Sequence, residues 1–227
     1  MSEWWTYSLS DFLMFSSRSY YRVIESYNAA IWPAHFLVLV AGVIVLGAIA
    51  RPRQHLQRSA ALVLAAAWGG VAWAYQLERY AEINTAAPYF AAAFAMQALL
   101  LCWLAYRPGN AAPAPQRVAL GLADLALFAY PLLALARDGG TWRQAEVFGI
   151  VPDPTVIVTL GLLLAWRAPA IFWLIPVSWC LVSGATLMAL KIGHAWLLPT
   201  IALAAVLARV MGSKKPRDVN STANPRS

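Results

Sequence analysis

An aspartate inside an apolar run is the residue of this sequence best suited to chemistry. Asp124 lies within the run 118–136, about 10 Å along a helix from Arg117. A charged group at the centre of a membrane span costs about 3 kcal/mol, so we expect Asp124 to face protein or water. Gln97 falls at a similar depth and can hydrogen-bond it. The pair is a candidate intramembrane site for a proton or cation relay, and the alternative is a structural carboxyl bonded to a neighbouring helix.

A second group of polar side chains is expected at the outer ends of the helices. Glu78 and Glu82 share a helical face, and Arg79 can pair with Glu82. These residues predict an outward polar vestibule formed by Asp153, Glu78, Arg79, Glu82, Asn84, His35 and His194. No tight ligand spacing such as His-x-x-x-His occurs in the sequence, so we expect no metal site. The alternative is a solvated helix end with interfacial anchors.

The third feature is the segment Val151-Pro152-Asp153-Pro154-Thr155. Asp153 is a good N-cap and Pro154 suits the first helical position, so a helix is predicted over 154–166. At about 20 Å this helix is too short to cross a bilayer unaided. Either 147–153 enters the membrane as irregular backbone lined by protein, or the bilayer thins locally. The alternative is an ordinary outer loop followed by a short hairpin helix.

The composition indicates which elements position these residues. Of the 227 residues, 61% are hydrophobic and 12% are charged, whereas soluble domains have about half and a quarter. This excludes a normal soluble enzyme, a disordered protein and a disulfide-stapled secreted domain, and predicts an all-α polytopic transmembrane helix bundle. Seven apolar runs are expected to span the membrane: 34–50, 59–77, 86–106, 118–136, 154–166, 170–190 and 194–210.

The distribution of basic residues predicts the threading of these spans. With the N-terminus outside and the C-terminus inside, eleven Lys and Arg residues lie on the inner side and six on the outer side. The positive-inside rule therefore favours N-out, C-in. The net charge of +7 would suggest a nucleic-acid partner in a soluble protein. Here the basic residues flank apolar runs, which is the pattern of membrane orientation, so we expect no nucleic acid as a partner.

The sequence divides into three parts under this threading. Residues 1–33 form an outer-surface segment in which 7–31 is an amphipathic helix, or alternatively an irregular extracellular stretch. Residues 34–211 form the transmembrane helical domain. Residues 212–227 are polar and basic, which predicts a disordered cytoplasmic tail.

Short stretches along the chain carry a resemblance. They are Ser8-Leu9-Ser10-Asp11-Phe12-Leu13, Tyr27-Asn28-Ala29-Ala30-Ile31-Trp32-Pro33, Ile83-Asn84-Thr85-Ala86-Ala87, and Phe148-Gly149 through Pro152-x-Pro154-Thr155 to Thr159-Leu160-Gly161. In these stretches the chain resembles an uncharacterised family of bacterial integral membrane proteins with a domain of unknown function. The family often has Cys between the two prolines, where this sequence has Asp153. The resemblance implies a bacterial inner-membrane location and carries over no catalytic residue.

Three functions are compatible with these features. The favoured hypothesis is binding or transport of a small solute or ion by a protein whose other partner is the lipid bilayer. The second is a membrane enzyme acting on a lipid-phase substrate through Glu78, Glu82, His35 and His194. The third is an accessory subunit that docks a protein partner on 7–31. The sequence has no phosphate loop, nucleophile elbow or Cys-x-x-Cys pair, so a non-enzyme is favoured and no cofactor is expected.

Overall fold

The computed structural model describes residues 15–51, 53–107 and 115–213, and the described part consists of helices and their connecting loops, without strands. Its α-helices are α1 (Ser17–Ala30), α2 (His35–Ala50), α3 (Gln54–Gly70), α4 (Ala87–Ala105), α5 (Gln116–Asp124), α6 (Pro152–Ala165), α7 (Leu174–Ala189) and α8 (Leu197–Ser213). The shorter helical segments are η3 (Val71–Leu77), η4 (Tyr80–Glu82), η5 (Leu125–Ala129), η6 (Tyr130–Ala134), η7 (Trp142–Gln144) and η8 (Ala170–Trp173). The prediction of an all-α protein is confirmed.

Each of the seven predicted apolar runs coincides with helix in the structure. Four helices are long and apolar enough to cross a membrane: Gln54–Glu82, Ala87–Ala105, Gln116–Ala134 and Ala170–Ala189. A fifth span is possible if α1 and α2, which are bent by 97° relative to each other, count as one. α6 and α8 are apolar but shorter. These lengths are compatible with insertion into a membrane.

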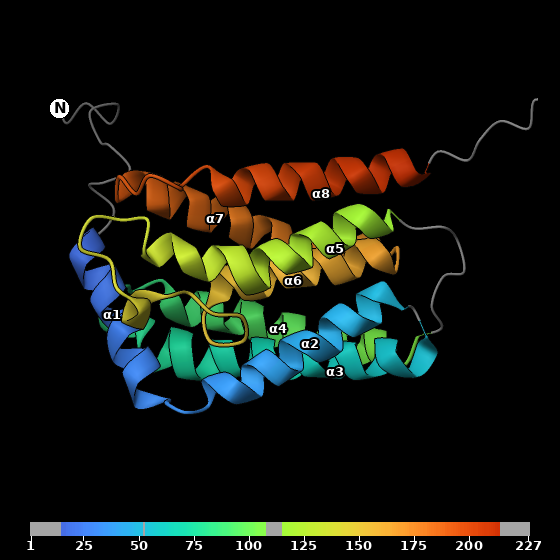
Figure 1. The fold of residues 1–227 in the computed structure, drawn as a ribbon, viewed down its shortest axis with the longest axis horizontal. Coiled ribbons are helices and arrows are strands. Elements are labelled where there is room, and N and C mark those ends of the chain that lie inside the picture. The colour runs from blue at the N-terminus through green and yellow to red at the C-terminus, as the bar shows by residue number, and fades with distance from the viewer. Residues whose placement is uncertain (1–14, 52, 108–114, 214–227) are drawn as a thin grey trace, which may run out of the picture.

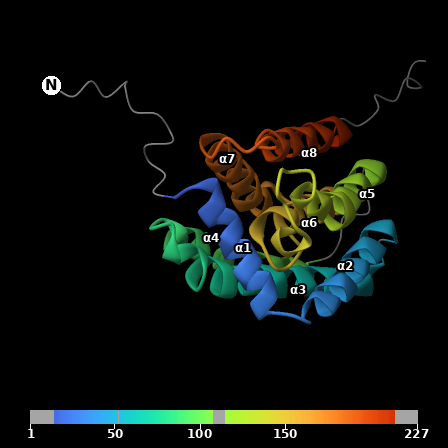
Figure 2. The same ribbon diagram turned by 60° about the vertical axis from the view of Figure 1, so that its left-hand side comes forward.

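Helix α1 crosses one end of the bundle, while the longer helices run roughly along its axis (Figures 1 and 2). Tyr20, Tyr21, Val23, Ile24 and Tyr27 are buried on the inner face of α1. The predicted amphipathic helix therefore exists over 17–30, but its apolar face packs on the chain's own helix ends. Residues 7–14 of that prediction, like 214–227 of the predicted tail, lie outside the described residues, whereas Gly212 and Ser213 continue α8.

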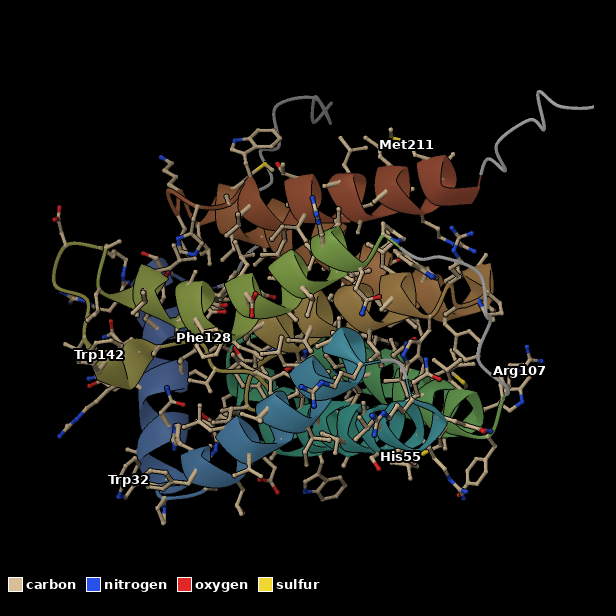
Figure 3. The ribbon with its side chains drawn as sticks, turned by 45° about the vertical axis from the view of Figure 1, so that its right-hand side comes forward. Trp32, His55, Arg107, Phe128, Trp142 and Met211 are labelled. Carbon is tan, nitrogen blue, oxygen red and sulfur yellow. The ribbon has the colours of Figure 1, made fainter. Side chains whose placement is uncertain are left out.

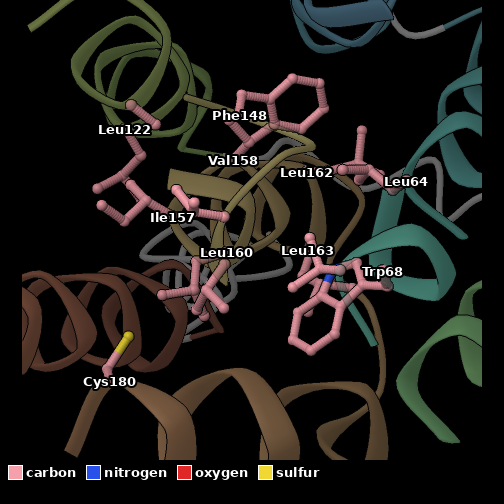
Figure 4. Packing of buried hydrophobic residues seen from close by; sticks show 14 of the residues in the cluster. Leu64, Trp68, Leu122, Phe148, Ile157, Val158, Leu160, Leu162, Leu163 and Cys180 are labelled. Carbon is pink, nitrogen blue, oxygen red and sulfur yellow. The ribbon is translucent and has the colours of Figure 1, made fainter. Parts of the chain in front are cut away.

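Helix α6 is the centre of the molecule. Every one of its 14 residues is buried, and α2, α3, α5, α7 and α8 pack around it. Figure 4 shows Ile157, Val158, Leu160 and Leu163 of α6 projecting toward the surrounding helices, with Leu163 beside Trp68 of α3. α6 is about 21 Å long, and the surrounding helices enclose it along its whole length.

Two of the long helices are interrupted by π-helical turns. α3 continues into η3, which carries Tyr75, and α5 continues into η5, which ends directly before Tyr130. Both tyrosines are buried and face the same end of α6. Each π turn shifts the residues that follow it around the helix, and such turns occur often at functional sites.

Candidate buried carboxyl site

Asp153 is the centre of a buried polar site at the N-terminal end of α6. It is 2% exposed, and its carboxylate accepts hydrogen bonds from three side chains. The Tyr130 hydroxyl lies 3.0 Å from Oδ2, the Trp179 indole N–H lies 2.8 Å from Oδ1, and the Ser183 hydroxyl lies 2.9 Å from both oxygens. All three donors are neutral, and together they satisfy an ionised carboxylate, which can only accept hydrogen bonds.

The helix start differs from the prediction in a way that creates this site. α6 begins at Pro152, with Val151 as its N-cap, and Asp153 makes no capping hydrogen bond. The N-cap assignment of Asp153 is therefore wrong by two positions. Its side chain is in the first turn, so the partial positive charge of the helix N-terminus stabilises a negative charge there.

Hydrogen bonds that involve a glycine and two threonines fix the start of α6. Gly149 has a positive φ of 74°, and its N–H donates to Thr155 Oγ1 at 2.8 Å. Thr155 in turn donates to the carbonyl of Val151 at 2.7 Å. Thr159, one turn on, accepts from the Trp68 indole at 2.8 Å. These contacts bring irregular backbone into the bundle with its polar groups satisfied.

A second carboxyl, Glu146, is buried in the irregular segment that leads to α6. Glu146 is 5% exposed, and Phe148, Ile150 and Val151 of the same segment are also buried. Residues 147–151 are irregular backbone that is largely enclosed by protein, and α6 begins at Pro152. Tyr20 of α1 donates to Glu146 Oε1 at 3.4 Å, and Oε2 has no partner within the described residues.

Burial and charge both act on the proton affinity of Glu146. Removal from water raises the pKa of Glu146 well above its ordinary value, and the nearby Asp153 carboxylate raises it further. The Tyr20 hydrogen bond and the charge of Arg137 oppose this shift. The guanidinium of Arg137 lies over the ring of Tyr21, 3.3 Å from its centroid. Glu146 is therefore suited to hold a proton next to an ionised Asp153.

Helix α1 is attached over this site by hydrogen bonds to the loop. Asn28 Nδ2 donates to the carbonyls of Arg143 at 2.8 Å and Ala145 at 2.9 Å. Gln144 donates to Glu25 at 3.1 Å and accepts from Arg137. These bonds hold the aromatic face of α1 above Glu146, so α1 covers the carboxyls at this end of the bundle.

A small cavity adjoins Asp153 between α1, η3, α4 and α7. Its volume of about 10 Å³ is at the lower bound for a single water molecule. Aromatic rings form much of its wall, and its lining includes Tyr20, Tyr75, Tyr80, Phe90, Asp153, Trp179 and Ser183. Phe90 and Trp179 pack edge to face at 5.3 Å, and Tyr75 stacks on Tyr80 at 5.7 Å. A carboxylate among aromatic rings is a setting that attracts a cation.

The structure does not gather the predicted vestibule into one site. Glu78 and Glu82 are both exposed. They do not share a helical face, because η3 ends before Glu78 and Glu82 belongs to the separate turn η4. Glu78 accepts from the Trp73 indole at 2.8 Å. Arg79 lies over the Tyr27 ring, 6.0 Å from its centroid, and no ion pair joins it to Glu82 within the described ranges.

The remaining vestibule residues have separate partners. Asn84 Oδ1 accepts from the backbone N–H of Ala86 at 2.9 Å, at the start of α4. His35 contacts Asn28 Oδ1 at 3.3 Å. His194 packs edge to face on Tyr130, with the ring centroids 6.4 Å apart. Asp153 and, through Tyr130, His194 are thus the two predicted residues that meet at the buried site. Among the described residues, no group of three or more His, Cys, Asp or Glu residues has the geometry to hold a metal ion.

The predicted pair of Asp124 and Gln97 does not form. Gln97 is fully buried and donates to the carbonyl of Phe172 at 3.2 Å. Asp124 is exposed on the outer face of α5, and no hydrogen bond joins it to another described residue. Asp124 lies outside the interior of this chain, because α5 turns Ala119, Leu122 and Ala123 toward α6.

Sequence reasoning missed most of the residues that build the site. Glu146, Tyr20, Tyr130, Trp179 and Ser183 come from four separate segments, and their proximity is not visible in any local spacing. A detectable signal was present in two places. Glu146 lies two residues before the Phe148-Gly149 stretch, and Tyr130-Pro131 interrupts an apolar run with a hydroxyl at the depth of Asp153.

Comparison with known proteins finds a matching family model. A family model described as a family of unknown function, DUF6064, covers residues 17–218. It therefore includes all of the helices described here up to α8. No curated protein and no solved structure matches the chain.

Proposed function

The chain belongs to the DUF6064 family of unknown function, and we propose that it is a multi-pass inner-membrane protein that binds a proton or a small cation at Asp153 in a transport-type role. The observation that carries this proposal is a fully enclosed carboxylate with neutral donors only, next to a second buried carboxyl and a water-sized cavity. A buried charge of this kind has a large desolvation cost and is a default indicator of function within a membrane.

The proposed threading has seven spans, with the N-terminus outside and the C-terminus inside. The two ends of the bundle differ in the way this threading requires. One end carries seven described basic residues and no described acid: Arg51, Arg53, Arg58, Arg107, Arg117, Arg167 and Arg209. Figure 3 shows His55, Arg107 and Met211 toward this end, and Trp32 and Trp142 at the opposite end. Arg107 and Arg58 stack on Trp103 at 4.1 Å and Tyr106 at 4.4 Å, as interfacial anchors do.

The chemistry of the site favours a cation over an anion. Asp153 supplies negative charge, the surrounding rings present electron-rich faces, and the guanidinium of Arg137 is occupied by Tyr21 and Gln144. A water-sized cavity fits a hydronium, a desolvated monovalent metal ion or an ammonium ion. Glu146 can accept or release a proton as the charge at Asp153 is neutralised.

The other two hypotheses have less support. The candidate catalytic set Glu78, Glu82, His35 and His194 is dispersed over separate contacts. The apolar face of α1, which was the docking surface of the scaffold hypothesis, is covered by the chain itself over 17–30.

Binding measurements on the purified protein test the proposal. Protein in mild detergent is titrated calorimetrically with NaCl, KCl and NH₄Cl, and proton release is followed with a pH-sensitive dye in weak buffer. We expect saturable binding of one cation, or proton exchange alone if the ligand is a proton. Asp153→Asn, which keeps the size of the side chain, should abolish the signal, and the exposed loop variant Asp138→Asn should leave it unchanged. Equal signals from wild type and Asp153→Asn would overturn the proposal.

The threading is tested separately in intact cells. A cysteine at the exposed position 55 should be protected from an impermeant thiol reagent, whereas one at the exposed position 142 should react. Variants lacking Cys102 and Cys180 provide the background. Labelling of position 55 alone would invert the proposed orientation.

A further inference from the structure

Asp124 occupies the least favourable position for a carboxyl in this protein. It is the ninth of the 19 residues of the apolar helix Gln116–Ala134, which places it about 12 Å from the start and about 15 Å from the end of that helix. Its side chain is exposed on the outside of the bundle. In Figures 1 and 2, α5 lies at the periphery between α2 and α8, with α6 on its inner side. If the chain spans a membrane as proposed above, this face of α5 is directed toward lipid.

A lone carboxyl in this position needs a hydrogen-bonding partner that the single chain does not supply. No described residue bonds to Asp124, and no Lys or Arg lies near the middle of an apolar run of the sequence. Polar side chains in membrane helices are normally turned toward the bundle interior or toward a neighbouring helix. A partner outside the chain is therefore required at the depth of Asp124.

The surface around Asp124 has the shape of a helix-packing face. Gly121, one turn closer to the inner end, is exposed, and a Cβ built on it meets no atom within 4 Å. One turn in the other direction, an apolar groove of about 260 Å³ runs between α2 and η5. The groove is lined by Leu39, Val40, Val43, Leu46, Leu127 and Phe128. A small residue allows close backbone approach, and the groove can receive a bulky side chain.

We infer that this face of α5 is a self-association surface, on which two copies of the chain pair with their Asp124 carboxyls in contact. All copies inserted in a membrane have the same threading, so a two-fold axis along the membrane normal brings identical residues together at identical depth. A carboxyl is suited to this arrangement, because a protonated Asp124 donates to the ionised Asp124 of the other copy. Phe128 of each copy then enters the groove of the other.

A second copy explains the surface better than a different partner helix. A foreign helix would have to carry a Lys, Arg or other donor at mid-membrane, which has its own insertion cost. A second copy brings an equivalent group that is already present, and the pair shares one proton and one negative charge. The inference rests on the proposed membrane insertion, and it is independent of the ion-binding role of Asp153.

Disulfide trapping in native membranes tests the pairing. In a background without Cys102 and Cys180, Gly121→Cys should form a covalent dimer under mild oxidation. Leu99→Cys, on the exposed face of α4, is the control and should remain monomeric. Absence of a Gly121→Cys dimer, or equal trapping at both positions, would overturn the inference.

The role of Asp124 itself is tested by energy transfer between labelled copies in liposomes. Asp124→Leu removes the shared hydrogen bond and should weaken association about tenfold. Asp124→Asn, which can both donate and accept, should retain most of it. Unchanged association of Asp124→Leu would refute the carboxyl contact. Because sodium, potassium and proton binding at Asp153 is measured separately, a failure of self-association is distinguishable from a failure of the proposed function.

Discussion

Asp153 and Asp124 are the same residue type in two apolar segments, and the structure treats them in opposite ways. Asp153 is enclosed at the start of a fully buried helix and accepts from Tyr130, Trp179 and Ser183. Asp124 is exposed in the middle of a peripheral helix. The difference arises from the layer in which each helix lies. An acid in an apolar run therefore indicates that a hydrogen-bonding partner is needed. The fold decides whether that partner lies inside the chain, as for Asp153, or outside it, as for Asp124.

Removing both carboxyls in turn gives the largest expected contrast. Asp153→Leu leaves the buried hydroxyls of Tyr130 and Ser183 and the partly buried indole of Trp179 without an acceptor. We therefore expect a loss of about 3 kcal/mol or more in the free energy of unfolding. Asp124→Leu removes an exposed group, and the free energy of unfolding of the dilute, monomeric protein should change by less than about 0.5 kcal/mol. Denaturant unfolding in mild detergent, followed by tryptophan fluorescence, measures both. Equal losses would remove the distinction between the two sites.

Two glycines, Gly161 on α6 and Gly121 on α5, offer a second contrast. A Cβ at Gly161 of α6 would lie 2.8 Å from the backbone carbonyl of Ala119, so Gly161→Val forces α5 away from α6. We expect a loss of about 2 kcal/mol in the free energy of unfolding. Gly121→Val on the exposed face of α5 should have little effect on the unfolding of the monomer, since no atom lies near its Cβ. The same unfolding measurement applies, and a tolerated Gly161→Val would show that the α5–α6 packing is looser than described.

The pH dependence of stability sharpens the account of the Asp153 side. The pKa of Glu146 is raised in the folded protein by burial and by Asp153, so the folded state binds more protons than the unfolded state between the ordinary and the raised value. Protonated Glu146 stabilises the folded state, and this stabilisation is fully present below the ordinary pKa of a glutamate. It is lost as the pH rises through the raised pKa of the folded protein, by up to about 1.4 kcal/mol per pH unit. Glu146→Gln should flatten this dependence in unfolding experiments at a series of pH values. An unchanged slope would assign the dependence to another group.

Periodicity and composition were sufficient to predict the helices. All seven apolar runs became helix, because long stretches without charge have few other ways to satisfy their backbone. The boundary at Pro152 was missed by two residues, since Pro at 152 and at 154 both suit the first turn and only tertiary contacts with Gly149 and Thr155 select the first. The sequence did not predict which face of α5 is buried, because apolar residues lie on several sides of Asp124 around the helix.

The site itself was predicted only in part. Asp153 was a candidate because of its place between two prolines, and His194 because of its position at a helix start. Glu146 and Tyr20 were not, because a loop carboxyl and a helical tyrosine become neighbours only when α1 folds over the end of the bundle. The π turns that precede Tyr130 and include Tyr75 have no recognised sequence pattern in this chain. Long-range contacts of this kind need the fold before they can be inferred.

Cation uptake into liposomes is the most direct measurement of the central claim, that Asp153 is the ion-binding carboxyl and Asp124 an assembly contact. Sodium, potassium and proton influx under an imposed membrane potential are compared for wild type, Asp153→Asn and Asp124→Asn at equal protein content. The account predicts that Asp153→Asn lowers the rate at least about tenfold and that Asp124→Asn retains most of it, because amide for carboxylate removes the charge at Asp153 but leaves a hydrogen-bonding pair at Asp124. Full uptake by Asp153→Asn, or loss of uptake in Asp124→Asn alone, would contradict it.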